Sequence, residues 1–187
     1  MFNTAEMTWS PSALPCRITS DRVEMTTLPR TDLWQRTFGH GGVDNAPVLQ
    51  AETREKHFTF TTKVTFEGRV QYDQAGLVMH LGADTWFKAS MELEDEHIRH
   101  LGSVVTNHGY SDWATVEVPA SVTVMWYRMT RQGSDFLLEC SADGKKYSLM
   151  RMFHMWNCDD LIRFGLYACS PGDSSFTAVF EELDFKA

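Results

Sequence analysis

The chain of 187 residues contains 17 lysines and arginines against 25 aspartates and glutamates, which gives a formal net charge of −8. The length suits one domain over residues 1–187, large enough to bury about 70% of its unfolded surface. The acidic balance argues against nucleic acid as a partner, and no apolar run is long enough to span a membrane. The first residues lack the basic start and apolar run of a signal peptide, so we expect a cytoplasmic protein without a membrane partner.

The four cysteines are widely spaced and include no CxxC pair: Cys16, Cys140, Cys158 and Cys169. A chain of this size does not need disulfides, and no export signal is visible, so we expect free thiols. The seven histidines form no ligand-spaced cluster with these cysteines. We therefore predict no zinc site, no other metal site and no cofactor.

Residues 1–30 hold three prolines and the pattern of two short strands, one of them near residues 22–27. Asp32 and Trp34 follow, just before a glycine-rich segment at residues 38–42 that indicates a loop or sharp bend. Two interpretations of this pair remain open. Asp32 can cap a turn while Trp34 fills the core, or both can lie at the rim of a binding site.

A hairpin over residues 70–93, with its turn at residues 82–84, is the segment around which the rest of the chain is organised. Side chains alternate between the two faces of a strand, so its residues can be sorted by parity. One face is apolar and belongs to a core: Leu77, Met79, Leu81, Phe87, Ala89, Met91 and Leu93. The opposite face gathers aromatic, amide and charged side chains: Tyr72, Gln74, Trp86, Lys88 and Glu92. This mixture exceeds what a solvated sheet face needs, which predicts a binding site.

Strict alternation over residues 57–66 predicts a half-buried strand. After the hairpin we expect a strand over residues 98–106, a loop over residues 107–113 and a short strand around residues 115–118. Further strands are predicted at residues 122–131, 134–141, 145–153, 162–169 and 175–185. In all, about eleven short strands without a convincing amphipathic helix indicate an all-β sandwich or barrel. Its predicted core consists of Phe58, Phe60, Leu77, Met79, Phe87, Met91, Leu101, Val105, Val124, Phe164 and Leu166.

Several short motifs together resemble one family. They are YDQAGL at residues 72–77, WFKA at 86–89, VVT at 104–106, SDW at 111–113, SADG at 141–144 and GLYACSP at 165–171, with Arg151. This pattern is similar to a domain-of-unknown-function family of the concanavalin A-like lectin/glucanase superfamily, typified by the yeast regulation-of-enolase protein. The resemblance extends from residue 31 to residue 180, and it implies a jelly-roll sandwich of two antiparallel sheets, one of them concave.

In that superfamily ligands commonly lie on the concave face or at its loops, which matches the face with Trp86, Lys88 and Glu92. Alternation places Tyr167 on the same face, and Arg151 joins it if its neighbours point inward. Lys88 and Glu92 are about 13 Å apart along one strand, so each needs a partner from another segment. Alternatively, Lys88, Glu92 and Arg151 form an ion-pair network that only keeps a sheet face soluble. The candidate ligand-binding residues are Tyr72, Gln74, Trp86, Lys88, Glu92, Arg151, Tyr167, Asp32, Trp34, Asp112 and Trp113.

Three functions fit these residues. The favoured one is non-catalytic binding of a carbohydrate or another small polar ligand, in which Trp86 stacks on a sugar ring. Lys88 and Arg151 would also suit an anionic sugar derivative. A glycoside hydrolase is the alternative, but it needs two carboxylates about 5–9.5 Å apart, and residues 92–96 match that requirement poorly, so no catalytic residue is predicted. The resemblance also implies an interaction protein that regulates enolase, with a glycolytic enzyme as partner.

Overall fold

The computed structural model describes residues 2–158 and 160–187, which form sixteen strands and two three-residue 3₁₀ helices. The helices are η1 (Thr4–Glu6) and η2 (Thr37–Gly39). The strands are β1 (Thr8–Ser10), β2 (Cys16–Ile18), β3 (Arg22–Thr26), β4 (Leu33–Gln35), β5 (Gly42–Asp44), β6 (Val48–Thr53), β7 (His57–Thr65), β8 (Gln74–Gly82), β9 (Thr85–Leu93), β10 (Ile98–Asn107), β11 (Tyr110–Pro119), β12 (Val124–Gln132), β13 (Asp135–Ser141), β14 (Ser148–His154), β15 (Ile162–Cys169) and β16 (Thr177–Lys186).

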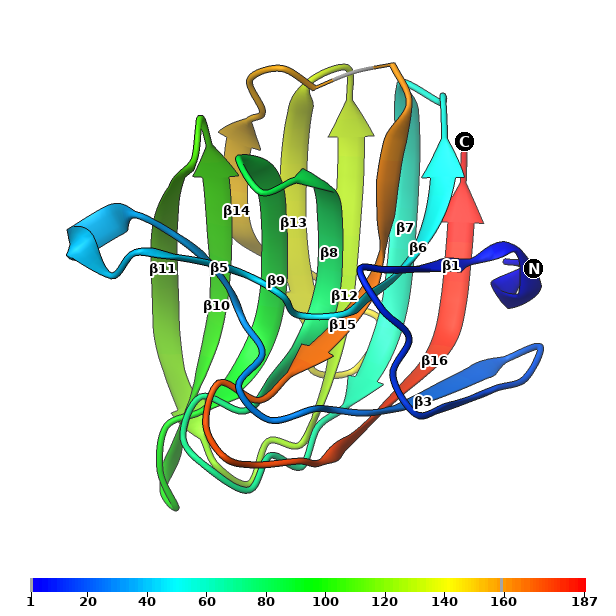
Figure 1. Cartoon of the computed structure of the whole chain (residues 1–187). Helices are drawn as coiled ribbons and strands as arrows, with labels where there is room; N and C mark the ends of the chain where they lie inside the picture. Colours follow the sequence, from blue (N-terminus) through cyan, green and yellow to red (C-terminus); the bar gives the residue numbers. More distant parts are fainter. Residues whose placement is uncertain (1, 159) are drawn as a thin grey trace.

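Two seven-stranded antiparallel sheets pack face to face (Figure 1). The front sheet has the strand order β1-β6-β15-β8-β9-β10-β11, and the back sheet has the order β14-β13-β12-β7-β16-β3-β2. Strands β4 and β5 pair only with each other. The predicted all-β jelly-roll sandwich of two antiparallel sheets is confirmed.

Strands β8 and β9 form the predicted hairpin in the middle of the front sheet. Met79 lies opposite Phe87 and Val78 lies opposite Lys88, so the predicted parity is correct. Met79 and Phe87 are fully buried in the main core between the sheets. Lys88 therefore points to the outer face of the front sheet, away from the main core.

Every predicted core residue except Val124 belongs to the cluster between the sheets. The prediction for Val124 was wrong, because β12 buries Met125, Tyr127 and Met129 instead. This parity turns Val124 and Trp126 outward. Apolar residues occupy both faces of β12, so hydrophobic alternation could not decide which face is buried.

Strand β11 begins directly after a two-residue turn, where a longer loop over residues 107–113 was predicted. His108 and Gly109 form this turn, with φ angles of 52° and 74°. Two successive positive φ angles match the right-handed twist of a tight hairpin. Asp112 and Trp113 consequently lie on an edge strand of the front sheet and not in a loop.

Residues 28–47, which include β4 and β5, cross the outer face of the front sheet; we call this segment the strap (Figure 1). The backbone N–H of Gln35 donates a hydrogen bond to Oγ of Ser111 at 2.8 Å. Farther along the strap, Asp44 Oδ1 lies 2.7 Å from Nε2 of His80. These contacts hold the strap against the sheet, so part of the outer face is closed to solvent.

Cys16, Cys140 and Cys169 are free thiols, and Cys169 is the buried one among them. Along residues 2–158 and 160–187, no helix has the length and apolar character that a membrane crossing requires.

Candidate functional site

The strap encloses a second apolar cluster on the outer face of the front sheet. Leu33 and Ala46 of the strap are buried in it, and Trp34 is partly buried against it. The front sheet contributes Val48, Val78, Trp86, Val104, Tyr167 and Cys169. Part of this face is therefore a small core, and not the open platform expected from the sequence.

Trp86 and Tyr167 lie on the predicted face but have no exposed surface. The indole Nε1 of Trp86 donates a hydrogen bond to the carbonyl oxygen of Ala83 at 3.0 Å. The hydroxyl of Tyr167 donates one to Oε1 of Gln74 at 3.0 Å. The prediction that Trp86 offers a stacking surface to a ligand is wrong, because the indole is enclosed by the strap and its neighbours.

Lys88 is the charged centre of this enclosed region, with a side chain only 5% exposed. Its Nζ lies 3.0 Å from Oδ1 of Asp32 in the strap, and 5.9 and 5.7 Å from the ring centroids of Trp86 and Tyr167. Burial alone would lower the pKa of Lys88, but attraction to Asp32 and the neighbouring acidic groups outweighs it, so the pKa is raised. The ion pair joins the strap to the sheet, and Asp32 also accepts a hydrogen bond from the backbone N–H of Leu33, so it caps a turn and contacts the outer face.

Glu92 lies at the other end of β9 from Trp86. Its Oε2 accepts a hydrogen bond from the amide of Gln74 at 2.9 Å, and its Oε1 is 4.0 Å from Nδ1 of His100. Burial raises the pKa of Glu92 to about 7, because attraction to Lys88 only partly offsets the loss of hydration. Such a carboxyl group changes its protonation near neutral pH, which is a common property of functional sites.

A narrow pocket lies between Glu92 and the edge of the front sheet. It is lined by Gln74, Lys88, Ser90, Glu92, His100, Gly102, Ser103, Val104 and Trp113. Its space is about 10 Å³, close to what one water molecule needs. Trp113 is 45% exposed, and its Nε1 lies 3.2 Å from where a Cβ on Gly102 would be. Because Gly102 has no side chain, the indole lies over the strand and closes the pocket.

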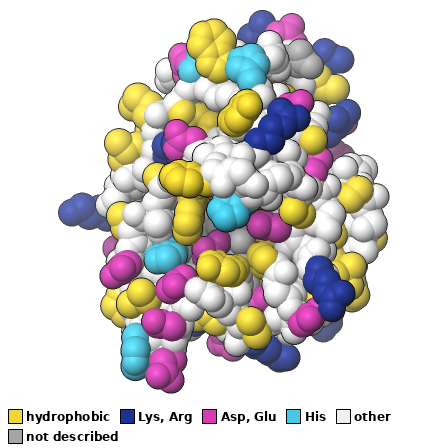
Figure 2. Space-filling view, turned by 60° about the vertical axis from the view of Figure 1, so that its left-hand side comes forward, with side chains coloured by type: hydrophobic (Ala, Val, Ile, Leu, Met, Phe, Trp, Pro, Cys, Tyr) yellow, Lys and Arg dark blue, Asp and Glu magenta, His cyan; other side chains and the backbone are white. Residues whose placement is uncertain are grey.

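Polar side chains on this side of the molecule retain unused bonding capacity. Figure 2 shows histidine and acidic side chains gathered around a shallow hollow. Nδ1 of His100 is 3.7 Å from Oε2 of Glu94, and this buried nitrogen has no hydrogen-bond partner in the protein. A bound polar molecule could satisfy it. Within residues 2–158 and 160–187, no group of three or more His, Cys, Asp and Glu side chains could hold a metal ion.

Three of the predicted site residues lie elsewhere. Arg151 is on β14 at the edge of the back sheet, and it reaches across to the carboxylate of Asp112 and the carbonyl of Ser103. Arg151 does not join the outer face, as alternation had allowed, because β14 belongs to the other sheet. Asp112, a candidate ligand-binding residue, lies opposite the core residue Val105 and faces that other sheet. Tyr72 lies in the turn before β8, with φ of 72° and an exposed side chain.

His100 is the residue of the candidate pocket that sequence reasoning missed. Alternation along β10 puts His100 on the same face as Gly102 and Val104. The register of the sheet sets His100 opposite Glu92 on the neighbouring strand. The signal was present in the sequence, but the pairing of the two strands was needed to connect these residues.

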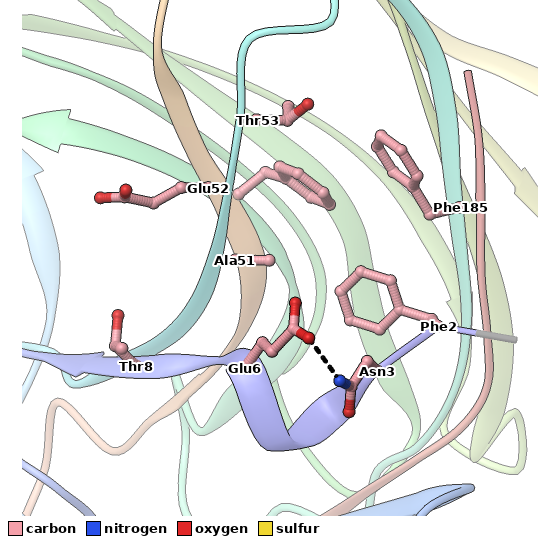
Figure 3. A pocket seen from close by; sticks show the side chains of 9 residues that line it. Phe2, Asn3, Glu6, Thr8, Ala51, Glu52, Thr53 and Phe185 are labelled. Carbon is pink, nitrogen blue, oxygen red and sulfur yellow. Dashed lines mark hydrogen bonds between the residues drawn. The ribbon is translucent and has the colours of Figure 1, made fainter.

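A separate cavity of about 550 Å³ opens at the N-terminal edge of the sandwich (Figure 3). Aromatic rings, including those of Phe2 and Phe185, form its apolar side. Both carboxylates near it have partners. Glu6 accepts a hydrogen bond from Asn3 at 2.6 Å, and Oε1 of Glu52 accepts one from Nε of Arg163 on β15 at 2.9 Å. The pocket beside Glu92 combines a carboxyl group of raised pKa with a buried imidazole nitrogen that lacks a partner, so it is the better candidate site.

A model of the family described as a protein of unknown function, DUF1349, matches residues 9–187. The chain belongs to this family. Its curated relatives include "Regulation of enolase protein 1" from Saccharomyces cerevisiae, which is 31% identical over 168 residues, with 89% of this chain and 82% of the relative covered. The family resemblance predicted from the short motifs is confirmed.

Solved structures share the fold of this DUF1349 chain. The crystal structure of a functionally unknown protein from Saccharomyces cerevisiae matches with a TM-score of 0.91 and 28% identity, covering 100% of this chain and 98% of that one. A xylan β-1,4-xylosidase from Bacillus halodurans C-125 matches with a TM-score of 0.74 and 12% identity, over 92% of this chain and 34% of the enzyme. An alginate lyase from Klebsiella pneumoniae matches with a TM-score of 0.58 and 9% identity, over 88% of this chain and 81% of the lyase. The two enzymes show a common fold alone.

We expect Trp86→Ala to lower the free energy of unfolding by about 3–5 kcal/mol, because the enclosed indole would leave a cavity in the outer-face cluster. Chemical denaturation of the two proteins measures this difference. Trp113→Ala, at a partly exposed tryptophan of the same face, is the control and should cost about 1 kcal/mol or less. A Trp86→Ala variant as stable as the wild type would show that the indole is not enclosed.

The raised pKa of Glu92 predicts stability that falls as the pH rises. The unfolded chain releases this proton near the ordinary value of 4.5, whereas the folded protein holds it until about pH 7. The folded state binds more protons between these values, so the free energy of unfolding decreases there, by up to about 3 kcal/mol.

Denaturation of the wild type and Glu92→Gln across this range tests the effect. Between pH 4.5 and 7 the free energy of unfolding of the wild type should fall relative to that of Glu92→Gln. Above pH 7 the difference between the two proteins should stay constant. Parallel stability curves would refute the raised pKa.

Proposed function

We propose that this protein is a non-catalytic binding and regulatory protein that recognises a small polar ligand, a sugar or an anionic sugar derivative, on the outer face of the front sheet. The observation that supports this most is the juxtaposition of the partly exposed indole of Trp113 with the imidazole of His100 and the carboxyl group of Glu92. An indole stacks on the apolar face of a sugar ring, while imidazole and carboxyl groups bind hydroxyls.

The pocket must widen to admit such a ligand, since its space is close to that of one water molecule. Trp113 is the wall that can move, because it lies on the edge strand β11 and is partly exposed. An outward swing of its indole opens access to Glu92 and His100 while the strap stays in place. Lys88 also lines the pocket, where its ammonium group can donate a hydrogen bond to a ligand while it stays paired with Asp32.

Glycoside hydrolysis is the second candidate, and it requires two carboxyl groups about 5–9.5 Å apart on either side of the scissile bond. Asp32 is ion-paired with Lys88 and accepts the backbone N–H of Leu33, so it is not free to act as nucleophile or base. Glu92, with its pKa of about 7, could donate a proton, which is the observation that favours an enzyme. Glu92 is the one carboxyl group among the residues that line the pocket, which supports binding over hydrolysis.

The name of the yeast relative, "Regulation of enolase protein 1", supports a regulatory role in carbohydrate metabolism. In that role the partner is a glycolytic enzyme, and the bound sugar derivative reports the state of metabolism to it. A cytoplasmic location accords with such a partner.

Calorimetric titration with a panel of monosaccharides and sugar phosphates tests this proposal. The wild type should bind at least one member, and Trp113→Ala should weaken that binding by roughly tenfold or more, the scale of losing one aromatic anchor. Its melting temperature should change little, because the side chain is partly exposed. Trp156→Ala removes another exposed indole, which is outside the pocket lining, and should bind as the wild type does.

Two outcomes would contradict the proposal. If no sugar or sugar phosphate binds, the outer face does not recognise such a ligand. If the protein releases sugar from a glycoside and Glu92→Gln abolishes the release, the pocket is a hydrolase site.

A further inference from the structure

The outer face of the back sheet, on the opposite side of the sandwich from the strap, contains a trough of about 780 Å³. Outward side chains of four neighbouring strands, β13, β12, β7 and β16, line it. Thr59 and Thr61 on β7 and Thr130 on β12 form its floor, and Thr59 lies directly opposite Thr130. These short side chains leave a hollow between the longer ones on either side.

An aromatic wall bounds the trough. Nε1 of Trp126 donates a hydrogen bond to Oε2 of Glu182 at 2.9 Å. Glu182 has φ of 53° and sits where the register between β16 and β7 shifts, so a bulge directs its carboxylate to the indole. The ring of Tyr147 packs against the guanidinium of Arg128, with its centroid 4.0 Å from Cζ. An unused sheet face does not require two aromatic rings held in this way.

The loop that supplies Tyr147 is held in one conformation. Oδ1 of Asp143 accepts a hydrogen bond from the hydroxyl of Ser141 at 2.9 Å. It also accepts hydrogen bonds from the backbone N–H groups of Lys145 and Lys146, at 2.8 and 2.9 Å. Gly144, with φ of 70°, packs on the indole, since a Cβ there would lie 2.9 Å from Nε1 of Trp126. The wall is formed before a ligand arrives, which reduces the entropic cost of binding.

Four of the five charged side chains that line the trough form two ion pairs, and the fifth, Glu182, accepts the hydrogen bond from Trp126. Arg128 makes two hydrogen bonds to the carboxylate of Glu139, at 2.6 and 2.8 Å. Nζ of Lys186 lies 2.8 Å from Oδ2 of Asp184. Since each pair is neutral, the trough offers oriented donors and acceptors with little excess charge to attract an ion. Threonine hydroxyls, paired polar groups and fixed rings together suit a ligand rich in hydroxyls but without charge.

We propose that this trough binds a neutral oligosaccharide, independently of the pocket at Trp113. The register places Leu137, Thr130, Thr59 and Lys186 in one row across the four strands. At a strand spacing of about 4.8 Å this row is about 14 Å long, which is greater than the width of one sugar ring. The wall at Trp126 and Tyr147 stacks on one sugar of the chain, and the threonine floor binds the hydroxyls of the next.

Calorimetric titration with uncharged linear oligosaccharides of glucose, xylose or mannose tests the proposal. The wild type should bind at least one of them, and Trp126→Ala should weaken that binding by roughly tenfold or more. Thr61→Arg fills the floor without altering either ring and should abolish binding. Thr65→Arg, on the same face of β7 but outside the trough lining, is the matched control and should bind as the wild type does.

Thr61→Arg also keeps the test decisive if Trp126→Ala fails to fold. Unchanged binding by Thr61→Arg would overturn the proposal, and so would binding that is lost in Trp113→Ala, since the oligosaccharide would then occupy the front sheet. Failure of every neutral oligosaccharide to bind, or binding of charged ones alone, would overturn it as well.

Discussion

The ion pair between Lys88 and Asp32 is the contact on which the outer face of the front sheet depends. It joins the middle of β9 to the strap inside a region almost closed to water, where an unpaired charge would cost about 3–5 kcal/mol. The strap it fastens encloses Trp86 and Tyr167. Because that part of the face is filled, a ligand has access only at the edge, where Trp113 covers a carboxyl group with a raised pKa.

Alternation along β8 and β9 was sufficient to predict which side chains enter the main core and which point outward. It could not predict that the outward indole of Trp86 is enclosed, because the enclosing residues come from the strap. Asp32 precedes Lys88 by 56 positions, and no local pattern connects them. The side chains of β8 and β9 were thus sorted to the correct faces, but the enclosure of much of the outer face was not predicted.

Predictions from the alternation of side chains failed in two situations. In one, both faces of a strand are apolar; in the other, the sequence does not show to which of the two sheets a strand belongs. Val124 and Met125 are equally suited to a core, so the burial of Met125 follows only from the pairing of β12 with β7. That same parity turns Trp126 toward the trough of the back sheet. Arg151 has a suitable charge for the outer face, yet β14 belongs to the other sheet.

A double-mutant cycle of Asp32→Leu and Lys88→Met tests the role of the ion pair most directly, with the free energy of unfolding as the measured quantity. If the pair holds the strap on the sheet, Asp32→Leu alone should be destabilised by about 3–5 kcal/mol, because it leaves Lys88 buried and unpaired. Adding Lys88→Met should then recover a large part of that loss. Strictly additive effects of the two substitutions would contradict the role of the pair.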